Sequence, residues 1–176
     1  VSGLGFCYIY INGKCINPDT FLPVSSDFEN TCDPVDEVIS AHRVYVPQFD
    51  ITPYVKEGKN SIAIHYGGGW YTFDNRIFGL PKAIYCITSE NENGISRFVS
   101  DENCRIKESC VKDYNFVRYE HWDYSDFEDC FALNFDDSSW ENAVPTENLE
   151  TEYCSTDCPW DKLIKKLPVT KIKESE

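Results

Sequence analysis

Hydrophobic and polar positions alternate with a period of two along much of this chain, which is the pattern of β-strands with one buried face. Residues 6–11 read FCYIYI, and the pair Asn12-Gly13 separates them from a second short run at 14–16. An Asn-Gly pair between two such runs is the strongest short signal for a β-hairpin, because both turn positions need a positive φ. We therefore predict a hairpin near the start of the chain.

Further segments carry the same alternation, and clusters of turn-forming residues such as 56–60 and 91–94 separate them. The predicted strands are residues 42–46, 49–52, 61–66, 83–88, 95–100 and 114–119. Short strands in this number predict an all-β protein built as a β-sandwich.

Helical periodicity is confined to the C-terminal part of the chain. Residues 159–167 place apolar side chains at the i, i+3, i+4 and i+7 positions, with Pro159 at an early position and Pro168 after the last. This spacing predicts a short amphipathic helix laid against the sandwich, and capping side chains predict a short turn at 136–141. Residues 18–41 have few periodic apolar positions and are interpreted as a long connecting loop.

The chain has 176 residues and a formal net charge of -14 at pH 7. This charge repels phosphate backbones and anionic headgroups, so nucleic acid and membranes are not expected as partners. The nine cysteines are odd in number and lack the dense spacing of a disulfide framework. We expect reduced thiols and a cytoplasmic protein. Secretion or a cell-surface location stays open, because the chain begins at Val1 without a Met, as a cut end would.

The acidic and histidine residues form no recognisable catalytic motif. The acids concentrated between 113 and 152 could supply oxygen ligands to calcium, but they lack EF-hand spacing, and a solvated acidic face is the favoured interpretation. Glycoside hydrolysis needs a pair of carboxylates, and the sequence singles out no pair. His42 and His65 lie in strand-like runs and are expected in the core or on a sheet face, and neither they nor His121 lie in a nucleophile motif.

Two cysteine spacings raise the question of a zinc site. Cys104 and Cys110 are separated by five residues, and Cys154 and Cys158 by three. Neither spacing is that of a zinc ribbon, so buried or loose thiols are favoured over a metal site.

The strongest candidate for ligand chemistry follows three consecutive glycines, residues 67–69. The candidate site residues are Trp70, Tyr71, Asp74, Asn75 and Arg76. Glycines let two backbones approach closely, aromatic rings pack on the C–H face of a pyranose, and carboxylate, amide and guanidinium groups bind hydroxyls. This mixture favours a carbohydrate site. In the alternative interpretation Trp70 belongs to the core and the glycines form a bulge.

Five segments of this sequence, in order, resemble the N-terminal accessory domain of bacterial α-L-rhamnosidases. They are residues 2–6 (SGLGF), 10–14 (YINGK), 50–60 (DITPYVKEGKN), 67–71 (GGGWY) and 135–140 (FDDSSW). The resemblance extends over most of the chain, and the order of the five segments makes it more specific than any one of them.

The resemblance implies a galactose-binding-like jelly-roll β-sandwich attached to an enzyme whose catalytic (α/α) barrel lies outside these residues. Residues 1–170 would form one domain of that larger enzyme, and 171–176 a linker to the next. Related modules can bind terminal L-rhamnose through a calcium ion. If this chain does so, we expect the site near Asp74 and Asn75 because of their position beside Trp70 and Tyr71, not because they match the family's ligand residues. The implied partners are a rhamnose-containing glycan or glycoside and the catalytic domain of the same polypeptide.

Two hypotheses of function follow. In the first, the chain is a non-catalytic carbohydrate-binding module of an α-L-rhamnosidase-like glycoside hydrolase. In the second, it is a structural scaffold between domains, without sugar affinity, and Trp70, Trp122 and Trp160 are core or pack on a neighbouring domain. A free-standing enzyme that uses paired carboxylates of the acidic segment is a third, less favoured hypothesis.

Overall fold

The protein consists of short β-strands joined by turns. The computed structural model describes residues 2–3, 5–18, 43–68, 82–92, 94–115, 118–145 and 152–157. Helical geometry within these ranges is restricted to two 3-10 turns, η2 (Thr52–Tyr54) and η4 (Tyr124–Asp126). None of the described helices has the length and apolar character that crossing a bilayer requires. The predicted all-β class is confirmed.

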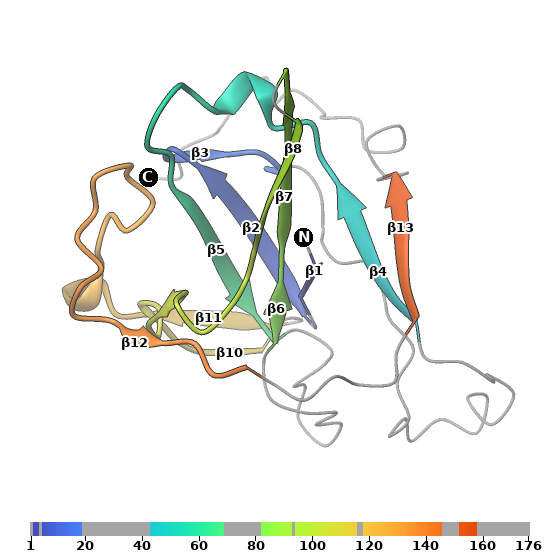
Figure 1. Ribbon diagram of the computed structural model, residues 1–176. Coiled ribbons are helices and arrows are strands. Elements are labelled where there is room, and N and C mark those ends of the chain that lie inside the picture. Colours follow the sequence, from blue (N-terminus) through green and yellow to red (C-terminus); the bar gives the residue numbers. More distant parts are fainter. Residues whose placement is uncertain are drawn as a thin grey trace, which may run out of the picture.

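Thirteen strands are described, and most of them pair as antiparallel ribbons. They are β1 (Ser2–Gly3), β2 (Phe6–Ile11), β3 (Lys14–Cys15), β4 (Arg43–Gln48), β5 (Ile62–Gly67), β6 (Ala83–Ile84), β7 (Cys86–Asn91), β8 (Gly94–Val99), β9 (Arg105–Ile106), β10 (Val111–Asn115), β11 (Tyr119–Trp122), β12 (Glu141–Asn142) and β13 (Glu152–Asp157). In Figure 1 the sheet β3-β2-β5 slants across the centre, β4 and β13 stand side by side, and β10 and β11 cross below β5.

The predicted N-terminal hairpin is confirmed as β2 and β3. Its turn residues Asn12 and Gly13 have φ values of 50° and 82°, as the Asn-Gly pair requires. The Asn12 side chain also ties the turn to a distant loop: its Nδ2 donates to the carbonyl of Tyr54 at 2.9 Å, and its Oδ1 accepts from the amide of Ser61 at 2.9 Å. One residue thus forms the turn and holds the start of β5 beside it.

The alternation along β2 separates its two faces as predicted. Cys7, Ile9 and Ile11 are buried, whereas Phe6, Tyr8 and Tyr10 point to the other side of the sheet. The residues packed against Cys7 and Ile9 are Ile16, Phe49, Ile64 and Tyr66. Together with Cys7 and Ile9, these residues form the main core of the described part of the chain.

Asn17 is a buried polar residue that continues the sheet where β3 ends. Its Oδ1 accepts a hydrogen bond from the Ile9 amide at 2.7 Å, and its Nδ2 donates to the Cys7 carbonyl at 3.0 Å. A side-chain amide therefore pairs with β2 in the place that the backbone of a longer β3 would occupy. This pairing allows the chain to leave the sheet at Pro18.

Burial in this core also controls the chemistry of one thiol. Desolvation raises the pKa of Cys7 to about 11, whereas Cys86 is exposed on β7. We expect iodoacetamide at pH 8 to label Cys86 within minutes and Cys7 only after denaturation, because the thiolate is the reactive form. Peptide mass mapping with and without denaturant measures this. Equal labelling of the two cysteines in the folded protein would contradict the buried position of Cys7.

Most of the remaining strand predictions are confirmed with small shifts of their ends. Residues 42–46, 61–66 and 95–100 correspond to β4, β5 and β8, and the predicted strand at 83–88 is divided at Tyr85 into β6 and β7. The turn residues 91–94 connect β7 to β8 as a hairpin. β13 pairs in parallel with β4. The alternation of hydrophobic and polar positions did not predict β13.

The predicted strand at 49–52 is wrong. The Asp50 carboxylate accepts a hydrogen bond from the Thr52 amide at 2.9 Å, and Pro53 occupies the first turn of η2. A side chain that bonds its own backbone two residues on, followed by a proline, stabilises a turn and leaves no donor for a strand ladder at that point.

The predicted strand at 114–119 is also wrong, because the chain reverses within it. β10 ends at Asn115, β11 begins at Tyr119, and Tyr114 pairs with Glu120. The amide of Arg118 donates to the carbonyl of Asn115 at 2.8 Å, which closes a tight turn. Two predicted features lie outside the described residues: the helix at 159–167 and the linker at 171–176. So does the loop at 18–41, apart from Pro18.

Candidate functional site

The sequence-predicted sugar site lies outside the described residues, but the backbone on both sides of it is described. Trp70, Tyr71, Asp74, Asn75 and Arg76 all belong to the range 69–81. β5 ends beside β2, where Phe6 pairs with Gly67, and β6 begins beside β1, where Gly3 pairs with Ala83. Both ends of the range 69–81 are therefore held next to the first residues of the chain.

Gly5 explains how these backbones come so close together. Its φ is +146°, and a Cβ at this position would lie 2.2 Å from the carbonyl oxygen of Gly67 and 2.8 Å from the carbonyl carbon of Gly68. The close backbone approach that the sequence predicts for the glycines at 67–69 thus occurs between Gly5 and Gly67-Gly68. Only glycine fits position 5, because any side chain would overlap this carbonyl.

A second candidate surface, which sequence reasoning did not identify, lies on the outer face of β2 and β5. Tyr8 pairs directly with His65, and Tyr10 with Ala63. Directly opposed residues of an antiparallel pair project to the same side. Tyr8 and His65 are therefore neighbours on the face opposite the core, and Tyr8 is 43% exposed. The FCYIYI alternation could have indicated this row of tyrosines.

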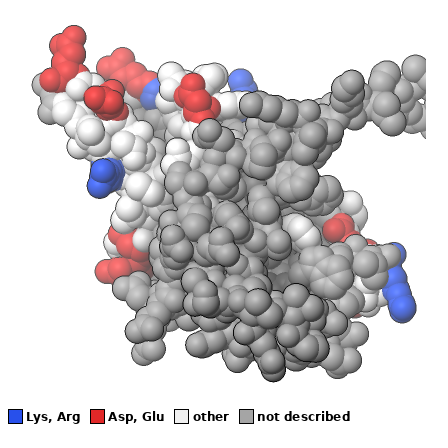
Figure 2. All heavy atoms as spheres, turned by 90° about the vertical axis from the view of Figure 1, so that its right-hand side faces the viewer, with Lys and Arg blue, Asp and Glu red and all other residues white. Residues whose placement is uncertain are grey.

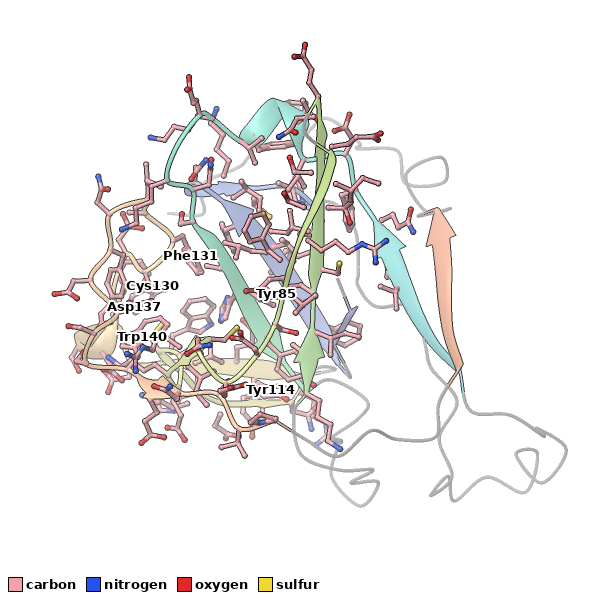
Figure 3. The ribbon with its side chains drawn as sticks, viewed as in Figure 1. Tyr85, Tyr114, Cys130, Phe131, Asp137 and Trp140 are labelled. Atoms are coloured by element: carbon pink, nitrogen blue, oxygen red, sulfur yellow. The ribbon has the colours of Figure 1, made fainter. Side chains whose placement is uncertain are left out.

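The loop that follows η4 brings another aromatic ring onto this face. The Phe131 ring stacks on Tyr10 with centroids 3.9 Å apart and planes 13° apart, and it lies 6.0 Å from the ring of His65. Figure 3 shows Phe131 between its loop and β5. Tyr10 and Phe131 thus form a rigid stacked pair beside the imidazole.

The hairpin β10-β11 adds a carboxylate and a second stacked pair. The indole Nε1 of Trp122 donates to the Glu120 carboxylate at 2.9 Å, and the Trp122 ring stacks on Tyr124 at 5.9 Å. Burial lowers the pKa of His65, and the nearby Glu120 charge opposes that shift. The lowered pKa keeps the His65 imidazole neutral at pH 7.

The described residues thus include two stacked aromatic pairs, each with a polar neighbour: Tyr10 with Phe131, near His65, and Trp122 with Tyr124, near Glu120. Tyr124 is 73% exposed. The expectation that His65 lies on a sheet face is confirmed. Chemically, this arrangement suits binding, since planar rings flank a neutral imidazole and a carboxylate acceptor.

The pKa of His65 predicts a pH-dependence of stability. Because the folded pKa lies below the unfolded value of about 6.5, the unfolded chain binds the proton first as the pH falls. The stabilisation is complete above about pH 6.5 and is lost as the pH falls through the folded pKa. We expect the midpoint of urea unfolding to fall between about pH 7.5 and 5.5, and His65→Gln to reduce this slope.

A matched variant separates this effect from general titration. His121 is exposed on β11, so His121→Gln should leave the pH-dependence as it is. Identical slopes in the wild type and in His65→Gln would show that the burial of His65 does not control acid stability.

The described carboxylates of the acidic segment lie exposed or half-buried, and some of them have counter-charges. Lys107 and Lys112, which precede it in the sequence, form ion pairs with Asp126, and Lys107 also pairs with Glu128. All four side chains are about one-third exposed or more, and the hydrogen bond from Lys112 lowers the pKa of Asp126. Exposed pairs of this kind contribute little to stability. Within the described ranges, no group of three His, Cys, Asp or Glu side chains could hold a metal ion.

Comparison with known proteins identifies the kind of domain to which these features belong. The chain matches the family described as the α-L-rhamnosidase N-terminal domain over residues 1–164. It is 24% identical over 187 residues to the α-L-rhamnosidase of Streptomyces avermitilis, an alignment that covers 98% of this chain and 16% of that enzyme.

Two solved structures share the fold. The α-L-rhamnosidase from Dictyoglumus thermophilum superposes with a TM-score of 0.71 and 27% identity, over 88% of this chain and 16% of that one. The Streptomyces avermitilis α-L-rhamnosidase complexed with L-rhamnose superposes with a TM-score of 0.68 and 21% identity, over 86% of this chain and 14% of that one. The chain thus spans about one-sixth of the length of these enzymes. Since the family match covers nearly all of its residues, the chain belongs to the family of α-L-rhamnosidase N-terminal domains.

Proposed function

We propose that this chain is a non-catalytic, carbohydrate-binding accessory domain of an α-L-rhamnosidase-like glycoside hydrolase. The observation that carries the proposal is the family match over residues 1–164, together with the small share of each relative that the chain covers. An accessory domain contributes affinity for the substrate, while a separate part of such an enzyme cleaves the glycosidic bond. The ligand is a rhamnose-containing glycan or glycoside, and the partner is the catalytic domain of the same polypeptide.

The sugar site of this proposal is the segment that carries Trp70, Tyr71, Asp74, Asn75 and Arg76. Its support is the chemistry of the residues: aromatic rings stack on the apolar face of a pyranose, and the three polar side chains suit adjacent hydroxyls. Carboxylate and amide oxygens are also the ligands that calcium prefers, so Asp74 and Asn75 would hold a calcium ion there.

A structural scaffold is the second candidate, and exposed apolar side chains on β8 favour it. Ile95, Phe98 and Val99 are 60%, 60% and 56% exposed. An apolar ribbon of this kind suits packing against a neighbouring domain. In this alternative the domain positions the catalytic unit and has no affinity for sugar.

Titration with L-rhamnose distinguishes the two functions. We expect saturable binding by calorimetry in the presence of calcium, with loss of binding after addition of a chelator. Asp74→Ala should lower affinity at least tenfold while leaving the unfolding midpoint unchanged, because a binding carboxylate contributes little to folding. Asn103→Ala, a change of an exposed polar residue on a different turn, is the matched control.

Three results would argue against the sugar-binding proposal. Absence of heat up to tens of millimolar L-rhamnose favours the scaffold. Binding that persists in Asp74→Ala places the site elsewhere. Strong destabilisation by Asp74→Ala indicates a structural hydrogen-bonding role for this carboxylate.

A further inference from the structure

We propose that this chain forms a two-fold symmetric dimer, in which the edge strand β8 of one copy pairs antiparallel with β8 of a second copy. The two ribbons β7-β8 then form one four-stranded sheet, in the order β7-β8-β8-β7. The inference goes beyond the proposed function, because it does not depend on sugar binding and uses none of the residues at 69–81.

The exposure of the ribbon β7-β8 is the first argument. All six residues of β8 are exposed, and so are all residues of β7 except Ile87. The side chains of Ile95, Phe98 and Val99 are 60%, 60% and 56% exposed. A ribbon of two strands with both faces in water is marginally stable. Pairing into a larger sheet would therefore stabilise it.

The free edge of β8 is the second argument. β8 pairs with β7 on one side, and no other described strand pairs with it on the second side. In Figure 1 the two strands of the ribbon run side by side, and the turn between them is at the top of the picture. Natural edge strands are commonly protected by proline or by several charges. β8 reads GISRFV, with no proline and one charged residue, Arg97, so its edge is open to a further strand.

The charge of β8 favours this strand as the place where two copies meet. Two chains with a formal net charge of -14 repel each other. Figure 2 shows acidic side chains at several places on the described surface. β8 differs from this surface, because its one charged residue is basic. Repulsion between two copies is therefore weaker at β8 than where acidic side chains oppose each other.

The sequence of β8 is complementary to itself in one register. With the two-fold axis at Ser96, Gly94 lies opposite the partner's Phe98, and Ile95 lies opposite the partner's Arg97. An aromatic ring that covers a glycine on the neighbouring strand compensates for the missing side chain. An axis at Arg97 would instead place two guanidinium groups directly opposite each other, which is destabilising. We therefore expect the pairing to be centred on Ser96.

An ion pair between the copies supports the same register. Within one copy, Ile95 pairs directly with Glu90, so both side chains project to the same side. Arg97, opposite the partner's Ile95, then lies two strand spacings from the partner's Glu90, about 10 Å between Cα atoms. Extended arginine and glutamate side chains together span this distance. The two-fold axis forms the ion pair twice.

Sedimentation velocity from micromolar to hundreds of micromolar protein tests the inference. We expect the sedimentation coefficient to rise with concentration toward that of a dimer. Arg97→Glu should raise the dimer Kd at least about tenfold, because it places like charges near each other twice. Adding Glu90→Arg to Arg97→Glu reverses the ion pair and should restore the wild-type Kd. Val144→Asp changes an apolar residue outside the ribbon that is 81% exposed, and is the matched control with no effect expected.

Cross-linking tests the register independently. In the proposed pairing the two Ser96 side chains face each other with Cβ atoms about 5 Å apart, close to the separation that a disulfide needs. We expect Ser96→Cys, treated with oxidised glutathione, to form a covalent dimer in which two copies of the same peptide are linked. Ser89→Cys is the matched control, since Ser89 pairs with Ser96 on β7 and is equally exposed, but lies on the outer strand of the joined sheet. It should not form this cross-link.

Three results would overturn the inference. A monomer at every concentration leaves the ribbon to a neighbouring domain of the same polypeptide. A dimer whose Kd is unchanged by Arg97→Glu associates through another surface. A dimer that Ser96→Cys does not cross-link does not have the proposed pairing of β8. None of these measurements contains sugar, so a failure of L-rhamnose binding leaves the dimer proposal standing, and the reverse also holds.

Discussion

Replacement of Asn17 by Ala will lower the free energy of unfolding by about 3 kcal/mol. The Asn17 side chain accepts from the Ile9 amide and donates to the Cys7 carbonyl, and Asn17 and Ile9 are both buried almost completely. Alanine would leave a donor and an acceptor on β2 without partners in a site that water does not reach. Each unsatisfied buried group costs about 1–3 kcal/mol, and a small cavity adds to this.

Urea unfolding followed by tryptophan fluorescence measures this effect. Asn103→Ala is the matched control, because Asn103 bonds only within an exposed turn around Asp101; it should change the free energy of unfolding by less than about 0.5 kcal/mol. A loss below about 1 kcal/mol for Asn17→Ala would mean that another group, or water, replaces both bonds.

Replacement of Gly5 by Ala is expected to be at least as harmful, with a loss of about 3 kcal/mol or more. The new methyl group would lie 2.2 Å from the Gly67 carbonyl oxygen, and the φ of +146° is one that residues with a Cβ rarely adopt. Both partners in this contact are backbone, so neither can turn away as a flexible side chain would. Relief requires the start of β2 to separate from the end of β5, where β5 leads into residues 69–81.

A neighbouring glycine provides the control for this change. A Cβ on Gly67 meets no atom within 4 Å, and its φ is not in the restricted range. Gly67→Ala should therefore have little effect on the unfolding midpoint. If Gly5→Ala were equally mild, the close approach of the two backbones would not be needed for folding.

At residues 114–119 the sequence correctly predicts β-structure, but it predicts one strand where the structure has the ends of two strands joined by a turn. Aromatic and β-branched residues in this stretch favour strands, and both flanks are indeed strands. The reversal between Asn115 and Tyr119 was missed because the intervening residues include neither glycine nor proline. The hydrogen bond from the Arg118 amide to the Asn115 carbonyl and the pairing of Tyr114 with Glu120 stabilise that turn.

The sequence by itself determined the features that depend on a few adjacent residues. The period of two along β2, the positive φ values at Asn12-Gly13 and the turn residues near 56–60 and 91–94 specify strands and turns through local sterics and hydrogen bonding. The five ordered segments were likewise enough to indicate the family, since each is a short stretch of chain.

Only the tertiary structure decided which distant residues meet. It brought Phe131 onto Tyr10, set Gly5 against Gly67 and paired β13 with β4. The physical reason is that periodicity shows which face of a strand is buried but contains no information about what covers the other face. Which residues cover that face depends on the entropy of closing the loops between them and on how well distant elements pack against one another.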